Sequence, residues 1–171
     1  MTNHSPQSID GIVKAVPQPD DSCAAPAADA NGVSDVAQRK PEADYAGDVS
    51  PQLAFQWWQA GDAVLVDVRT DAEREWVGFV PGALALPWKL WPGMALNPDF
   101  DKGITAAVPA GQKVVFLCRS GVRSVAAAQR ATELGIAAYN ILEGFEGDAD
   151  QDAHRGGQGG WRYRGLPWRQ G

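Results

Sequence analysis

The chain has 171 residues and a formal net charge of −6 at pH 7, a length that suits one α/β domain with a hydrophobic core. The negative charge argues against a nucleic-acid binder, which usually carries a basic face. No apolar run reaches the roughly 20 residues that span a bilayer, and the N-terminus lacks the apolar segment of a secretory signal, so we expect a cytoplasmic protein without nucleic-acid or membrane partners.

Residues 1–44 differ in composition from the rest of the chain. They are rich in Ala, Pro, Asp, Ser and Gln, and they contain no aromatic residue. Because such a segment buries too little apolar surface to offset its ordering entropy, we predict a disordered N-terminal tail that includes Cys23. A folded domain is predicted over residues 45–171.

The folded part begins with a helix and a strand. Ser50 suits the N-cap of a helix, Pro51 its first position, and Gly61 lies just past its predicted end. The continuous apolar run at 63–68 is typical of a buried parallel strand. A short helix is predicted next, at 70–76.

The second half continues the alternation of strands and helices. We predict a short strand between prolines, a helix containing Gly103, a buried strand, a helix ending at Gly135 and a last strand, at 81–87, 97–108, 112–118, 123–135 and 137–142 respectively. This order predicts an α/β fold, a parallel central sheet flanked by helices on both faces. Ligands of such sheets bind beyond the carboxyl ends of the strands, where Cys118 lies.

The loop CRSGVRS, at 118–124, joins the second buried strand to the next helix. Gly121 allows a sharp turn whose backbone N–H groups form an anion site, and the following helix adds the positive end of its dipole. Arg119 and Arg123 add permanent positive charge. The pattern predicts a thiolate nucleophile, Cys118, in an anion-binding loop. The alternative, a buried structural cysteine, does not explain the two arginines.

The two cysteines do not form the framework of a disulfide-rich domain, because their surroundings are so different. No paired Cys/His spacing of a zinc site is present either. We therefore expect no cofactor and no structural metal.

Several motifs, in the same order, resemble the rhodanese (sulfurtransferase) family in its single-domain bacterial form: LVDVRTDAEREWVGFVPGALALP, CRSGVRS, NILEGFEG and GWRYRGLPW. The resemblance covers about residues 45–171. It implies an α/β domain in which Cys118 takes the outer sulfur of a donor as a persulfide and passes it to a thiophilic acceptor. It also implies a sulfur cradle around Cys118, formed by Arg119, Ser120, Gly121, Val122 and Arg123. Asp67 and Arg69 match the family's D-x-R motif, which implies a mainly structural role.

Two departures from the family pattern stand out. Phe79 replaces a histidine, usually taken as structural, in the motif before PGA. Residues 148–160 lengthen the segment between LEGFEG and Trp161, and we expect a solvated, glycine-rich loop that borders the mouth of the site. Its polar residues, Asp148, Asp150, Asp152 and His154, suggest a cation site only weakly, because their spacing differs from that of a calcium loop.

Three functions stay open on the sequence alone. The first is a sulfurtransferase that uses thiosulfate or a persulfide donor and a thiol, cyanide or protein acceptor; the basic loop favours thiosulfate over mercaptopyruvate. The second is a cysteine phosphatase or arsenate reductase, although those enzymes place five residues between Cys and Arg, and four separate Cys118 from Arg123. The third is a non-catalytic module that binds partners, although such modules often lack the cysteine.

Overall fold

The structure, a computed structural model, describes residues 44–171. The predicted disordered tail at 1–44, with Cys23 in it, lies outside the described residues except for Asp44. No helix of the described part is long and apolar enough to cross a membrane.

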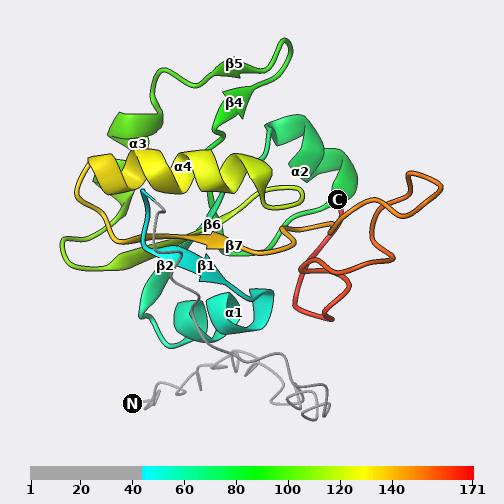
Figure 1. Ribbon diagram of the computed structural model, residues 1–171. Coiled ribbons are helices and arrows are strands. Elements are labelled where there is room, and N and C mark those ends of the chain that lie inside the picture. The colour runs from blue at the N-terminus through cyan, green and yellow to red at the C-terminus, as the bar shows by residue number, and fades with distance from the viewer. Residues whose placement is uncertain (1–43) are drawn as a thin grey trace, which may run out of the picture. The chain divides into compact units, whose positions relative to one another are not determined.

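The centre of the fold is a parallel sheet of five strands (Figure 1). In spatial order these are β1 (Gly47–Val49), β7 (Ala138–Ile141), β6 (Lys113–Leu117), β2 (Ala63–Asp67) and β3 (Leu84–Ala85). Because β6 is the middle strand, the residue that follows it lies at the centre of the carboxyl edge. That residue is Cys118.

Helices cover both faces of the sheet, which confirms the predicted α/β fold. Helix α1 (Pro51–Gln59) lies on one face, and α3 (Phe100–Ala107) and α4 (Val122–Glu133) lie on the other (Figure 1). Helix α2 (Asp71–Val77) follows β2 at the carboxyl edge. The predicted cap of the first helix is confirmed, since the Ser50 hydroxyl accepts from the Leu53 amide at 3.1 Å.

The core is divided between the two faces by the alternation of side chains along each strand. In β6, Val114 and Phe116 pack with residues of α3 and α4, whereas Val115 and Leu117 pack with residues of α1. All four side chains are fully buried. Burial on both sides explains why the strand reads as a continuous apolar run.

Three short strands were not predicted from the sequence. Strand β1 has three residues, and an antiparallel hairpin outside the main sheet pairs β4 (Lys89–Leu90) with β5 (Ala95–Leu96). The helix predicted at 97–108 begins only at Phe100. The other predicted helices and strands are present, with ends that differ by one or a few residues.

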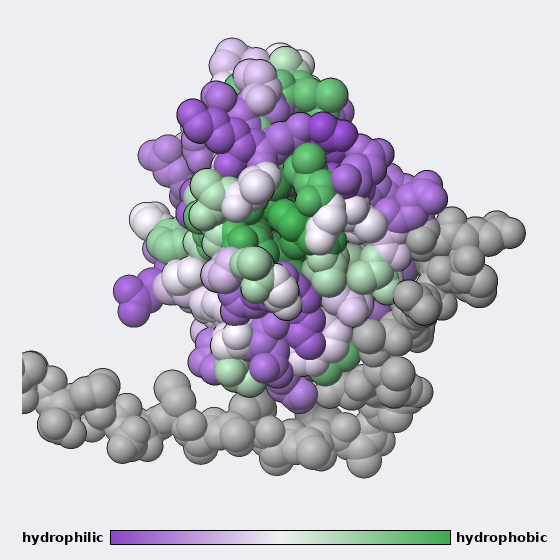
Figure 2. All heavy atoms as spheres, turned by 90° about the vertical axis from the view of Figure 1, so that its left-hand side faces the viewer, coloured by the Kyte–Doolittle hydropathy of each residue, from purple (hydrophilic) through white to green (hydrophobic). Residues whose placement is uncertain are grey.

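The amino ends of the strands lie at the edge opposite Cys118. Figure 2 views the molecule from this side and shows hydrophobic residues gathered amid a mostly hydrophilic surface. The loops after β2, β6 and β7 lie at the carboxyl edge, and that of β6 begins with Cys118.

Candidate active site

The sulfur of Cys118 is held inside the loop that joins β6 to α4. Sγ accepts hydrogen bonds from the Gly121 amide at 3.1 Å and from the Ser124 hydroxyl at 3.2 Å, and the residue is only 1% exposed. Gly121 has a φ of +94°, in the left-handed region that favours glycine. It is also the N-cap of α4, and its amide, which has no acceptor within the helix, donates to the sulfur.

Arg123 is paired with an acidic residue of another element. Its two terminal nitrogens donate to the Glu73 carboxylate at 2.7 and 2.5 Å, in the bidentate arrangement that makes such pairs strong. Hydrogen bonding to Glu73 is the main factor that raises the pKa of Arg123, and the charge of Cys118 adds to it. Arg123 therefore contributes positive charge to the loop while each of its terminal nitrogens donates to Glu73 of α2.

Glu73 also begins α2, as a reciprocal cap with Thr70: each side chain accepts from the other residue's amide. Burial raises the pKa of Glu73, but hydrogen bonds from Arg123 and Thr70 outweigh burial and bring it to about 2, from 4.5. One carboxylate thus fixes both the start of α2 and the side chain of Arg123.

We expect Glu73→Gln to lower the free energy of unfolding at pH 7 by about 1–3 kcal/mol, because Arg123 loses its partner at a partly exposed site. A depressed carboxyl pKa stabilises the fold above the unfolded value, and this stability is lost as pH falls through the folded value. The difference in unfolding free energy between the native protein and the variant should therefore become smaller as the pH falls from 4.5 to about 2. Urea unfolding at several pH values measures it. Glu75→Gln, an exposed position of the same helix, is the matched control, and an equal loss there would contradict the prediction.

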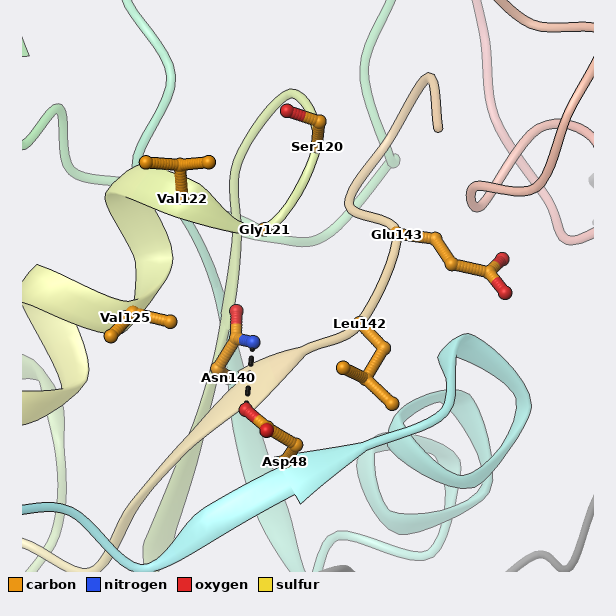
Figure 3. A pocket seen from close by; sticks show the side chains of 8 residues that line it. All are labelled: Asp48, Ser120, Gly121, Val122, Val125, Asn140, Leu142 and Glu143. Carbon is orange, nitrogen blue, oxygen red and sulfur yellow. Dashed lines mark hydrogen bonds between the residues drawn. The ribbon is translucent and has the colours of Figure 1, made fainter. Parts of the chain in front are cut away.

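The outer part of the loop faces solvent. Arg119 is exposed, and no hydrogen bond or ion pair from its guanidinium to another described residue is formed. Val122 is 76% exposed. Ser120 and Gly121 are half-buried and line a pocket of about 400 Å³ beside the loop (Figure 3). Arg119 is therefore the loop arginine whose donors are available to an anionic ligand.

Asp67 and Arg69 form a buried ion pair behind the loop. The Asp67 carboxylate accepts from Nε and Nη2 of Arg69 at 3.0 and 2.6 Å, and both residues are fully buried. The guanidinium carbon of Arg69 lies 3.9 Å from the centre of the Phe145 ring. The pair thus supports the segment that carries Phe145, and it does not line the pocket.

That segment, residues 143–147, forms the floor of the loop. The amides of Phe145 and Glu146 donate to the carbonyls of Cys118 and Arg119 at 2.8 and 2.9 Å. Gly144 lies so close that a Cβ there would be 2.6 Å from backbone atoms of the loop. The chain after β7 therefore fixes the backbone of the nucleophile.

A second layer of polar side chains lies between Cys118 and β1. Ser124 donates to Oδ1 of Asn140 at 2.6 Å, and Nδ2 of Asn140 donates to the Asp48 carboxylate at 2.9 Å. The Tyr45 hydroxyl donates to the same carboxylate at 2.8 Å. Burial, then the contact with Asp48, raises the pKa of Tyr45 to about 12. Figure 3 shows the Asp48–Asn140 bond at the base of the pocket, with Gly121 on its opposite wall.

The 148–160 insertion folds back on the segment after β7. Gly156 donates its amide to the Glu146 carbonyl at 2.9 Å, and Gly160 donates to the Glu143 carboxylate at 2.7 Å. Ligand atoms of Asp150, Asp152 and His154 lie within 4.8 Å of one another. A turn accounts for this proximity, because Asp150 accepts from the amides of the other two residues.

Comparisons with known proteins agree with this architecture. The family model of the rhodanese-like domain matches residues 50–150. A crystal structure of Rv0390 from M. tuberculosis is 44% identical, with a TM-score of 0.67 over 74% of this chain and 99% of that one. An uncharacterized protein of Rickettsia rickettsii is 38% identical over 110 residues, which are 63% of this chain and 83% of that protein. A rhodanese-related protein from Thermoplasma volcanium shares the fold, with a TM-score of 0.51 and 16% identity. The match covers 72% of this chain and 98% of that one.

The match of the family model over residues 50–150 and the shared sheet architecture assign the fold to the class of rhodanese-like domains. The chain belongs to the rhodanese-like family, as the resemblance of its motifs implied.

Sequence reasoning did not single out several residues that the structure brings to the site. Glu73 was recognisable as a capping residue, because it follows Thr70 by three positions. Asp48 and Asn140 are polar residues next to apolar strand residues, which is a weaker indication. Their contact with the site depends on the pairing of β1 with β7.

Proposed function

We propose that the protein is a sulfurtransferase that carries a sulfane sulfur as a persulfide on Cys118. Thiosulfate or a related persulfide is the donor, and a thiol, cyanide or a protein thiol is the acceptor. One observation carries the proposal: Sγ of Cys118 is directed into a short loop, between the Gly121 amide and the Ser124 hydroxyl, with Arg119 free to bind an anion.

The reaction has two steps, and each conserves charge. In the first, the Cys118 thiolate attacks the outer sulfur of thiosulfate, and sulfite leaves with the electron pair of the broken S–S bond. In the second, the acceptor thiolate or cyanide attacks the outer sulfur of the persulfide, and Cys118 leaves as the thiolate. The two donors to Sγ stabilise the thiolate at the beginning and the end of this cycle.

The length of the loop favours sulfur over phosphoryl transfer. Four residues separate Cys118 from Arg123, so the ring of amides is small. A single sulfur atom on Sγ fits inside such a ring, whereas a phosphoryl group adds further oxygens that each need a donor at roughly 2.7–3.1 Å. We therefore expect persulfide formation from thiosulfate and no hydrolysis of aryl phosphates.

Intact mass after incubation with thiosulfate tests the proposal directly. We expect a gain of one sulfur atom, which is lost again on addition of cyanide as thiocyanate forms. An aryl phosphate assay on the same preparation is the companion measurement. Phosphatase turnover without any sulfur uptake would mean that the cysteine performs different chemistry, and neither activity would indicate a binding module.

Arg119→Ala is expected to lower kcat/KM for thiosulfate by about tenfold to a hundredfold, because a charge-assisted contact with the dianion is lost. The effect should lie mainly in KM, since Arg119 is exposed and contacts the donor before the sulfur is transferred. Lys102→Ala, which removes an exposed cation of α3, is the control for overall charge. Unchanged saturation by thiosulfate in Arg119→Ala would assign donor binding to other groups.

A further inference from the structure

A chain of buried side chains connects the sulfur of Cys118 with strand β1. Ser124 contacts Sγ, Asn140 accepts from Ser124, and Asp48 accepts from Asn140. These three residues are at most 3% exposed. We propose that Asp48 is a positioning residue of the active site. It fixes the orientation of the Asn140 amide and thereby controls whether the Ser124 hydroxyl donates its hydrogen bond to Asn140 or to the Cys118 sulfur.

The orientation of the amide follows from the chemistry of Asp48. A carboxylate only accepts hydrogen bonds, so the end of Asn140 that faces it must be the NH₂ group. The Asn140 carbonyl oxygen is therefore directed at Ser124, 2.6 Å away. The Tyr45 hydroxyl donates to the same oxygen of Asp48, which holds the carboxylate in place from the other side.

The Ser124 hydroxyl has one proton and two acceptors. Oδ1 of Asn140 is 2.6 Å away and Sγ of Cys118 is 3.2 Å away, and only one of them receives the proton at a time. A hydrogen bond to an ionised acceptor is about twice as strong as one to a neutral acceptor. The Ser124 hydroxyl therefore donates to the sulfur when the sulfur is a thiolate, and to Asn140 when the sulfur is neutral.

This exchange matches the two states of sulfur transfer, and here the inference rests on the proposed function. Sγ is a thiolate before it attacks the donor and a neutral, two-bonded sulfur once the persulfide has formed. In the first step the Ser124 hydroxyl changes its acceptor from Sγ to Asn140. In the second step it donates to Sγ again as the thiolate is released. Without a fixed acceptor at Asn140, Ser124 would donate to the sulfur throughout and favour the thiolate over the persulfide.

Charges of both signs surround the sulfur. Positive charge comes from the loop, and negative charge comes from neighbouring elements, partly compensated by paired arginines. The groups are Arg119, Arg123 with Glu73, Asp67 with Arg69, Asp48 with Tyr45, and, in the segment beneath the loop, Glu143 with Arg164 and Glu146 with Arg162. Only Asp48 among them is joined to the sulfur by hydrogen bonds through Ser124. Replacing Asp48 should therefore shift the ionisation of the Cys118 thiol by a route that depends on Ser124, whereas the effect of a change in general charge does not depend on Ser124.

The test uses Asp48→Asn in the full chain, with Cys23→Ser as the common background so that Cys118 is its sole thiol. The new asparagine side chain keeps the shape of Asp48, but its NH₂ group can donate to Asn140. The Asn140 amide can then rotate so that its oxygen and nitrogen exchange places. The pH titration of the thiolate ultraviolet absorbance, with Cys118→Ser subtracted, gives the midpoint of ionisation. We expect this midpoint to fall by on the order of one pH unit, and the fraction of persulfide at equilibrium with thiosulfate to fall with it.

Two further variants separate positioning from other roles. Tyr45→Phe removes a neighbouring hydrogen bond of the same carboxylate but keeps its charge and the link to Ser124, so its midpoint should shift much less than that of Asp48→Asn. In a Ser124→Ala background, Asp48→Asn should shift the midpoint much less. An unchanged midpoint with only a lower melting temperature, or a full shift without Ser124, would overturn the inference. Failure of persulfide formation in the native protein would instead count against the proposed function, since the titration needs no sulfur donor.

Discussion

The Cys118→Ser variant is expected to take up no sulfur from thiosulfate, while it unfolds at nearly the temperature of the native protein. A serine hydroxyl is almost the same size as the thiol but is not ionised near neutral pH, so the nucleophile is lost. The loop keeps its shape because backbone bonds hold it: the Phe145 amide donates to the carbonyl of residue 118, and the Glu146 amide donates to that of residue 119. Intact mass and thermal unfolding of the same samples measure both parts.

Cys23→Ser is the matched control, since it makes the same chemical change in the other cysteine of the chain. It should form the persulfide as fast as the native protein and transfer the sulfur to cyanide at the same rate. Sulfur uptake by Cys118→Ser, or its loss in Cys23→Ser, would place the carrier sulfur outside the β6–α4 loop.

The sequence was sufficient to predict a parallel sheet with its buried strands and the place of the cysteine, because these depend on local patterns. Strands buried on two faces read as apolar runs, as β2 and β6 do. A cysteine directly after such a run must lie at the carboxyl edge of a parallel sheet. The glycine that turns the chain at position 121 was recognisable for the same reason, since few other residues adopt its backbone conformation.

The partners of the loop residues could not be predicted, because they come from distant parts of the chain. Glu73 and Arg123 are separated by 50 positions, and Asp48 and Asn140 by 92. The second pair requires the strand order, in which β1 lies beside β7, and the first requires α2 to lie beside the start of α4. With three residues, β1 is too short to show the alternation that reveals a strand. Arg123 stays a predicted member of the sulfur cradle, and the acid that pairs with it was not identified from the sequence.

A second large effect is expected from Gly144→Ala, a single added methyl group beneath the β6–α4 loop. Gly144 has a φ of +62°, and an added Cβ would lie 2.6 Å from the Cys118 carbonyl oxygen, the Arg119 carbonyl carbon and the Ser120 amide nitrogen. These are backbone atoms that have no rotamer to adjust. Either the segment after β7 moves away or the cradle does, and the bond from the Phe145 amide to Cys118 is strained in both cases. Sγ then shifts from its two donors.

We expect Gly144→Ala to lower the free energy of unfolding by about 2–4 kcal/mol. The rate of persulfide formation should fall by at least about a hundredfold. Gly135→Ala is the matched control, because Gly135 has a φ of +83° but no atom within 4 Å of an added Cβ. It meets only the backbone strain, about 1 kcal/mol, and should keep its activity. Urea unfolding and single-turnover persulfide formation distinguish the two. Equal losses in both variants would mean that left-handed strain alone explains Gly144, whereas a loss of activity confined to Gly144→Ala follows if close packing against the floor fixes the position of the sulfur.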